Sequence, residues 1–183
     1  VRNDLFGRGF TAQALLGLLP RDWTVADIGC GTGNATELIA PWVDRVIAVD
    51  RSEPMLDAAR NRLAGAGRVE FVLGDLGHLP MEDDSVDAAV CILVLHHIEA
   101  PLPALREMAR IVRPGGPVLI VDMVEHSRDE YRRTMGHIHL GFARNTVEEL
   151  LEDAGLERTQ WSTLPSDPDA RGPGMFAATG RKP

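Results

Sequence analysis

The sequence predicts an α/β protein with a mainly parallel sheet. Short apolar runs of strand character alternate with longer stretches of helical spacing along most of the 183 residues. A glycine-rich turn directly follows the first apolar run, and acidic residues end three successive runs. Strands that alternate with helices are typical of parallel sheets, because each return to the same edge of the sheet requires a crossover.

The predicted elements follow one another in a regular order. An amphipathic stretch at 11–19 carries leucine and alanine at helical spacing and precedes the first strand. Near the end of the chain, Thr146 begins a capping-box pattern whose helix ends at Gly155. The expected strands are 24–28, 45–50, 69–73, 86–93, 118–121, 157–164 and 175–179, and the expected helices between them are 35–43, 54–66 and 102–112.

Length and composition exclude several classes of function. The chain is most simply one domain over residues 1–183, with residues 1–20 as a helical lead-in. A net charge of −8 argues against nucleic-acid binding through this domain. No apolar run approaches the roughly 20 residues that cross a bilayer, so we expect no membrane association and a cytoplasmic location. Cys30 and Cys91 lie far apart in unlike contexts, and no metal site is predicted.

The glycine-rich turn indicates a ligand site. Gly29, Gly31 and Gly33 let the backbone approach a ligand closely at the carboxyl edge of the sheet, where α/β proteins bind. The dinucleotide pattern G-x-G-x-x-G is matched neither from Gly29 nor from Gly31, which weakens a nicotinamide interpretation. Asp27 weakens it further, since a carboxylate repels a pyrophosphate but suits an ammonium group. A plain tight turn is the alternative for this motif taken alone.

Two more carboxylates extend the pattern. Asp50 ends the second predicted strand, roughly 20 positions after the turn, where an acidic residue accepts hydrogen bonds from ribose hydroxyls. Asp75 follows Gly74 at the end of the third strand, where it could accept from the exocyclic amine of adenine. Any one of these carboxylates is more typical of a solvated strand end. The ordered set fits a ligand with an ammonium group, a ribose and an adenine but no phosphate, which is S-adenosylmethionine.

Together these motifs resemble those of class I S-adenosylmethionine-dependent methyltransferases, from about Asp22 to the end of the chain. The resemblance implies the Rossmann-like fold of that family. This fold has a seven-stranded, mostly parallel sheet with an antiparallel C-terminal strand and helices on both faces. The matching segments are 27–33 (first motif), 49–55 (ribose motif), 74–75 (adenine motif), 87–97 (fourth-strand motif) and 110–116 (turn before the fifth strand).

The resemblance also implies roles in holding S-adenosylmethionine. The glycine turn is expected to pack against the methionine and ribose, Asp27 to attract the α-ammonium group and Asp50 to accept from both ribose hydroxyls. Met55 is expected to lie against adenine, and the carbonyl of Cys91 to meet the ammonium group. The complete predicted cofactor-binding set is Asp27, Gly29, Cys30, Gly31, Gly33, Asp50, Arg51, Met55, Gly74, Asp75, Leu76 and Cys91.

Two regions are candidates for the acceptor side. His96 and His97 follow the fourth strand, where a base of near-neutral pKa could reach an oxygen or nitrogen nucleophile. A structural role is an equal alternative for each histidine, and His97 is favoured over His96 as the catalytic base. The family usually varies substrate recognition between the fifth strand and the last helix, here an insert at 123–146. The predicted substrate-binding residues are Tyr131, His137, His139 and Phe142, and Tyr131, Thr134, Met135 and Ile138 are expected to share one helical face, as core or pocket wall.

Within the family, the chain is most like the methyltransferase part of bacterial fusions with an ArsR-type regulator. The likeness rests on residues 4–20 and 131–142. Because the chain opens at Val1 without a winged-helix segment, such a DNA-binding domain is expected upstream. A second likeness is to the ubiquinone/menaquinone-biosynthesis methyltransferases.

The predicted function is methyl transfer to a small, mainly apolar acceptor. Arsenite methylation is disfavoured because it needs several thiols and the chain has two cysteines. Nucleic-acid methylation is disfavoured by the acidic balance and by the lack of an Asn/Asp-Pro-Pro-Tyr/Phe motif after the fourth strand. The alternative is a module that senses S-adenosylmethionine or a small ligand for an attached repressor, with little or no turnover. A homodimer is left open as the state of assembly.

Overall fold

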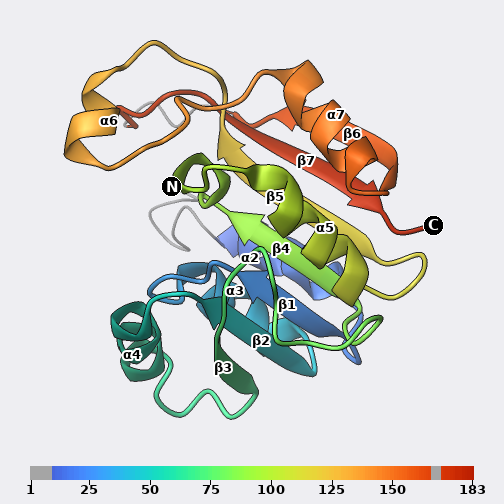
Figure 1. Cartoon of the computed structure of the whole chain (residues 1–183). Coiled ribbons are helices and arrows are strands. Elements are labelled where there is room, and N and C mark those ends of the chain that lie inside the picture. The colour runs from blue at the N-terminus through green and yellow to red at the C-terminus, as the bar shows by residue number, and fades with distance from the viewer. Residues whose placement is uncertain (1–9, 166–169) are drawn as a thin grey trace.

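The computed structural model describes residues 10–165 and 170–183 and has a seven-stranded sheet at its centre (Figure 1). The strands are β1 (Thr24–Ile28), β2 (Arg45–Asp50), β3 (Val69–Leu73), β4 (Ala88–Ile92), β5 (Pro117–Met123), β6 (Glu157–Thr163) and β7 (Met175–Arg181). Their spatial order is β3-β2-β1-β4-β5-β7-β6, so the chain winds outward in both directions from β1. The predicted Rossmann-like fold class is confirmed.

The pairing of the strands brings their carboxyl ends to one edge. Strands β1 to β5 are parallel to one another, while β7 runs antiparallel to both β5 and β6. Ile28 pairs with Val49 across β1 and β2, and Asp50 pairs with Leu73 across β2 and β3. The turns that leave β1, β2, β3 and β4 therefore meet at the same edge, where ligands of open α/β sheets bind.

Helices cover both faces of the sheet, because successive strand residues point to opposite sides. Ala26 and Ile28 pack in the larger core cluster with α5 and α7, while Val25 packs with Ile39 and Val43 on the other face. Among the described residues, no helix has the length and apolar character to span a bilayer. The helical segments are α2 (Phe10–Leu15), η1 (Leu16–Leu18), α3 (Asn34–Ile39), η2 (Ala40–Trp42), α4 (Glu53–Arg62), η3 (Leu95–His97), α5 (Pro101–Ile111), α6 (Glu130–Thr134) and α7 (Arg144–Asp153).

Several predicted element limits were wrong, and the helix expected at 54–66 ends at Arg62 in α4. The fourth strand was expected at 86–93 but occupies Ala88–Ile92, because Leu93 has a φ of 58° and turns the chain out of the extended conformation. The last helix was expected to begin at Thr146 but begins at Arg144, with Ala143 as its N-cap. The Ala143 carbonyl already accepts the first helical bond from the N–H of Val147, so Thr146 lies inside the helix and forms no capping box.

The structure describes part of the predicted lead-in and all of the predicted insert. Residues 1–9 of the lead-in lie outside the described residues, and the remainder forms α2 and η1. The insert leaves β5 and carries the short helix α6, which projects beyond the end of the sheet (Figure 1). It returns to the sheet at Phe142, whose N–H donates to the carbonyl of Met123.

Candidate functional site

A cavity of about 500 Å³ opens at the carboxyl edge of the sheet. Cavities of this volume are typical of small-molecule sites. Its wall combines the turn after β1, the ends of β2 and β3, the segment after β4 and the start of α5. The predicted residues that line it are Gly29, Gly31, Asp50, Arg51, Met55, Asp75, Leu76 and His97.

The glycine turn can form only with residues that tolerate positive φ. Gly29, Gly31 and Gly33 have φ values of 75°, 53° and 82°. A Cβ on Gly29 would lie 2.6 Å from a methyl carbon of Val94, whereas a Cβ on Gly31 would meet no atom within 4 Å. Gly29 is thus required for packing against the segment after β4, and Gly31 leaves its side of the cavity open to a ligand.

Asp27 lies beneath this turn and does not belong to the cavity wall. Its side chain is buried on the α3 side of β1, and Thr36 donates its hydroxyl proton to Oδ2 at 2.5 Å. Burial raises the pKa of Asp27 to about 6, although the bond from Thr36 opposes this effect. Burial, aided by the nearby Asp27 and Asp50 charges, also raises the pKa of Cys30 to about 12, so this thiol stays neutral.

Asp50 is fixed by the backbone on both sides. Its Oδ2 accepts the N–H of Gly31 at 2.8 Å, and its Oδ1 accepts the N–H of Ser52 at 2.9 Å. The residue is 9% exposed and remains part of the cavity wall. Each carboxylate oxygen has a further lone pair, so the group can accept two more hydrogen bonds from a ligand in the cavity.

The end of β3 supplies a second carboxylate. Asp75 is exposed, and its Oδ1 accepts the N–H of Gly77 at 2.7 Å, which leaves Oδ2 available. Leu76 is buried beside it, and Met55 lies on the same cavity wall with 46% of its surface exposed. Gly74 is outside the lining, and a Cβ there would lie 2.7 Å from the ring of Pro80.

The segment after β4 places its two histidines differently. His96 is 4% exposed and donates its Nδ1 proton to Oδ1 of the fully buried Asp122 at 2.8 Å. His97 lines the cavity, and its Nδ1 lies 3.2 Å from the carbonyl oxygen of Gly136. Burial, followed by repulsion from His96, lowers the pKa of His97, which favours its neutral form at neutral pH. Cys91 is fully buried in β4, and burial raises the pKa of its thiol well above the usual range.

The insert contributes residues that lie near the histidines of η3 and residues that pack in the hydrophobic core. His137 is 7% exposed and lies against His96, with ring centroids 4.3 Å apart. Tyr131 lies next to His137 at 5.3 Å between ring centroids. His139 instead donates its Nε2 proton to the carbonyl of Ile98, and Phe142 is buried in the main core. Tyr131, His137, His139 and Phe142 all lie outside the cavity lining.

The expected helical face of the insert does not exist. Helix α6 ends at Thr134, so Met135 and Ile138 follow it in non-helical chain and are 54% and 41% exposed. Gly136, with a φ of 70°, turns the chain sharply after the helix. This turn directs His137 inward, while Met135 and Ile138 stay at the surface.

Several residues that shape the site were not predicted from the sequence. Asp122, next to the last residue of β5, was missed because its contact with His96 depends on the pairing of β4 with β5, which no local pattern shows. Thr36 was missed because its role depends on the packing of α3 against β1. The unpredicted lining residues are Ser52, Gly77, Leu93, Val94, Ile98, Ala100 and Ala104.

Comparisons with known proteins agree with this geometry. Residues 26–120, just over half of the chain, match the model of the methyltransferase domain family. A demethylmenaquinone methyltransferase from Clavibacter sepedonicus is 37% identical over 122 residues, which cover 67% of this chain and 49% of that protein. A malonyl-[acyl-carrier protein] O-methyltransferase from Yersinia pestis is 36% identical over 115 residues, covering 63% of this chain and 42% of its own length. The chain thus spans about half the length of these two relatives.

Solved structures show the same fold at low identity. A SAM-dependent methyltransferase from Aquifex aeolicus superposes with a TM-score of 0.73 at 24% identity, over 98% of this chain and 91% of its own. Phosphoethanolamine N-methyltransferase 2 of Haemonchus contortus, in complex with S-adenosyl-L-methionine, gives a TM-score of 0.78 at 18% identity, over 99% of this chain and 56% of its own. With the family model matched over the glycine turn and the first strands, the chain belongs to the methyltransferase domain family.

Proposed function

We propose that this chain is an S-adenosylmethionine-dependent methyltransferase that acts on a small, mainly apolar acceptor. The observation that carries the proposal is the carboxylate of Asp50, held by the N–H groups of Gly31 and Ser52 at the cavity wall. A carboxylate fixed in this way can accept both hydroxyls of a ribose at little further cost in side-chain entropy. It would repel a phosphate at the same place, which favours a nucleoside ligand without a pyrophosphate.

The remaining cavity wall fits the other parts of this cofactor. Met55 and Leu76 provide apolar contacts for an adenine ring, and the free Oδ2 of Asp75 can accept from its exocyclic amine. Asp27, buried beneath the glycine turn, attracts an α-ammonium group through the turn rather than by contact. Family membership and the S-adenosylmethionine complex of the Haemonchus contortus protein support the same ligand.

The acceptor side of the cavity is apolar with few polar groups. Leu93, Val94 and Ile98 line it, and His97 supplies a polar side chain. The sulfonium is already an activated leaving group, so the protein has chiefly to hold the nucleophile in line at about 3 Å from the methyl carbon. A neutral His97 with its Nδ1 proton directed at Gly136 has a free Nε2 toward which the proton of a nucleophile can move. The name of the demethylmenaquinone methyltransferase above supports a small, mainly apolar acceptor.

Calorimetry with S-adenosylhomocysteine tests the cofactor assignment. Wild-type protein is expected to bind S-adenosylhomocysteine and not NAD. Asp50→Ala is expected to weaken S-adenosylhomocysteine binding by about 1–3 kcal/mol, because charge-assisted hydrogen bonds to the ribose are lost. Asp50→Asn is the matched variant that keeps the shape and removes the charge. Since Asp50 also holds Gly31 and Ser52, thermal unfolding of each variant must accompany the titrations. A well-folded wild-type protein that binds no S-adenosylhomocysteine would contradict the proposal.

Methyl transfer itself requires an acceptor screen. Metabolite extracts incubated with the protein and methyl-labelled S-adenosylmethionine should yield a labelled small molecule. Labelling of added RNA, DNA or protein in place of a small molecule would contradict the proposed acceptor class. Binding of S-adenosylhomocysteine with no transfer to any acceptor would favour the alternative of a ligand-sensing module.

A further inference from the structure

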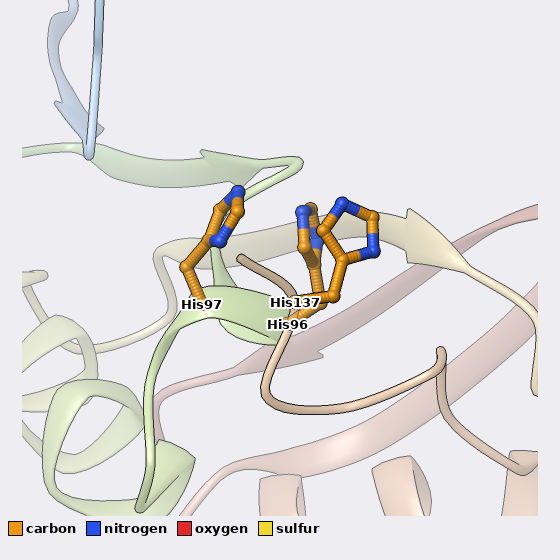
Figure 2. A group of neighbouring side chains, drawn as sticks. All are labelled: His96, His97 and His137. Atoms are coloured by element: carbon orange, nitrogen blue, oxygen red, sulfur yellow. The ribbon is translucent and has the colours of Figure 1, made fainter. Parts of the chain in front are cut away.

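The rings of three histidines form a cluster beside the cavity. His96 and His97 come from η3, and His137 comes from the loop after α6, about 40 residues later in the chain (Figure 2). The ring centroid of His96 lies 4.1 Å from that of His97 and 4.3 Å from that of His137. One nitrogen from each ring can be chosen so that all three lie within 4.8 Å of one another. Within residues 10–165 and 170–183 these three imidazoles pack together without a shared hydrogen-bond partner, which requires an explanation.

The hydrogen bonds of the rings leave one nitrogen of His96 and one of His97 without a partner among the described residues. His96 donates its Nδ1 proton to Asp122, and His97 directs Nδ1 at the carbonyl of Gly136. In both rings the bond at Nδ1 fixes the tautomer with a free Nε2. The Nδ1 of His137 is buried and has no hydrogen-bond partner among the described residues. An unpartnered polar atom on a ring that is 93% buried is costly, and a ligand shared by the three rings would remove that cost.

We propose that His96, His97 and His137 form a binding site for a divalent transition-metal ion, with Zn²⁺ as its representative. Imidazole nitrogen is a preferred donor for zinc and related metals. Three protein ligands with one position left open are the arrangement of catalytic zinc sites.

The surroundings of the three rings resemble the outer shell of a metal site. Asp122 is fully buried and accepts the Nδ1 proton of His96, and histidine ligands of metals usually donate their second nitrogen to a carboxylate or carbonyl in this way. The same carboxylate also accepts the N–H groups of His96 and Met123, which holds it in place. The carbonyl of Gly136 has the corresponding position behind His97.

The backbone holds the two segments together before any ion binds. The carbonyl of His96 accepts the N–H groups of Ile138 and His139 at 2.9 and 3.1 Å, so the loop with His137 is fixed against η3. A tetrahedral zinc ion at about 2.1 Å from each nitrogen requires nitrogens about 3.4 Å apart. The three nitrogens already lie within 4.8 Å of one another, so each separation has to shorten by no more than about 1.4 Å on binding.

The position of the cluster indicates what the ion would do. His97 belongs both to the cluster and to the cavity lining, so an ion held by the cluster would lie beside the cavity. This role rests on the proposed function. When a hydroxyl or phenol oxygen of the acceptor binds the ion, the pKa of that acceptor hydroxyl falls. The oxygen loses its proton to water and attacks the methyl carbon, so the O–CH3 bond forms as the S–CH3 bond breaks and S-adenosylhomocysteine leaves with its sulfur neutral. With the ion bound, His97 acts through the metal rather than as a free base.

Zinc titration of the chelator-treated full chain tests the site directly. One zinc ion per chain is expected by calorimetry and elemental analysis, and Co²⁺ in its place should give the visible absorption of a tetrahedral complex. His97→Ala and His137→Ala should each weaken zinc binding at least about 100-fold, and Asp122→Asn by about 10–100-fold. His78→Ala is the matched control, since His78 is exposed and outside the cluster, and should bind zinc as the wild type does.

Two results would overturn the metal site. One is a wild-type chain that takes up neither zinc nor cobalt. The other is zinc binding that His137→Ala leaves as strong as His78→Ala does. Circular dichroism checks that each variant folds, and His137→Gln replaces His137→Ala should the latter unfold. A parallel titration with S-adenosylhomocysteine separates this inference from the proposed function. Zinc binding without S-adenosylhomocysteine binding contradicts the methyltransferase proposal alone, and the reverse result contradicts the metal site alone.

Discussion

The cofactor edge and the acceptor edge of this site are built in different ways. The cofactor edge consists of the turns after β1, β2 and β3, where a side chain binds the backbone N–H groups of neighbouring turns, as Asp50 does with Gly31 and Ser52. The acceptor edge joins η3 to a distant insert, and its contacts run between side chains such as His96, Asp122 and His137. The acceptor edge depends on side chains from segments far apart in the chain, so we expect changes there to alter acceptor specificity more than cofactor binding.

The largest expected effect is a loss of kcat without a loss of cofactor affinity, which distinguishes the acceptor edge from the cofactor edge. His97→Ala should lower kcat by about 10²–10⁴-fold, whether the ring acts as a base or through an ion, because the group that promotes proton loss from the acceptor is removed. The affinity for S-adenosylhomocysteine should change little, because Asp50 and Asp75 are untouched. Steady-state kinetics with an identified acceptor and calorimetry measure the two effects, with His78→Ala as the control. A parallel loss of cofactor affinity would show that the edges are not separate.

A second comparison lies within the insert, between a core residue and a surface residue. Phe142 is 5% exposed in the main core, so Phe142→Ala should lower the free energy of unfolding by about 3–5 kcal/mol. Met135 is 54% exposed, and Met135→Ala should change that free energy by no more than about 0.5 kcal/mol. Urea unfolding followed by circular dichroism measures both. Equal losses would mean that the insert packs as one unit and that Met135 is part of its core.

The cofactor edge has a pH dependence of its own. Burial raises the pKa of Asp27 from 3.8 to about 6, so the folded state binds this proton more tightly than the unfolded chain does. The contribution is fully present below about pH 4 and is lost as the pH rises through about 6, by about 3 kcal/mol in total. The wild-type chain should therefore lose stability relative to Asp27→Asn between about pH 4.5 and 7.5. Urea unfolding of both proteins across this range measures the difference, and parallel profiles would contradict the raised pKa.

Prediction from the sequence was most accurate for features that depend on local backbone conformation. The seven strands were predicted with their number and approximate limits, because strand periodicity and glycine punctuation are local properties of the chain. The glycine turn and the carboxylates at the ends of β2 and β3 were also placed at the cavity in advance. The prediction of a helical face in the insert was wrong, because the apolar spacing of the sequence continues beyond Thr134 although the chain turns at Gly136.

Local patterns in the sequence were sufficient for the order of strands and helices and for the glycine turn at the cavity wall. Those patterns are set by φ values, by side-chain periodicity and by where each strand ends, all within a few residues. The pairing of His96 with Asp122, the burial of Asp27 against Thr36 and the approach of His137 to His97 depend on residues far apart in the chain. Such contacts follow from strand register and loop closure, which bring distant side chains together only when the whole sheet has formed.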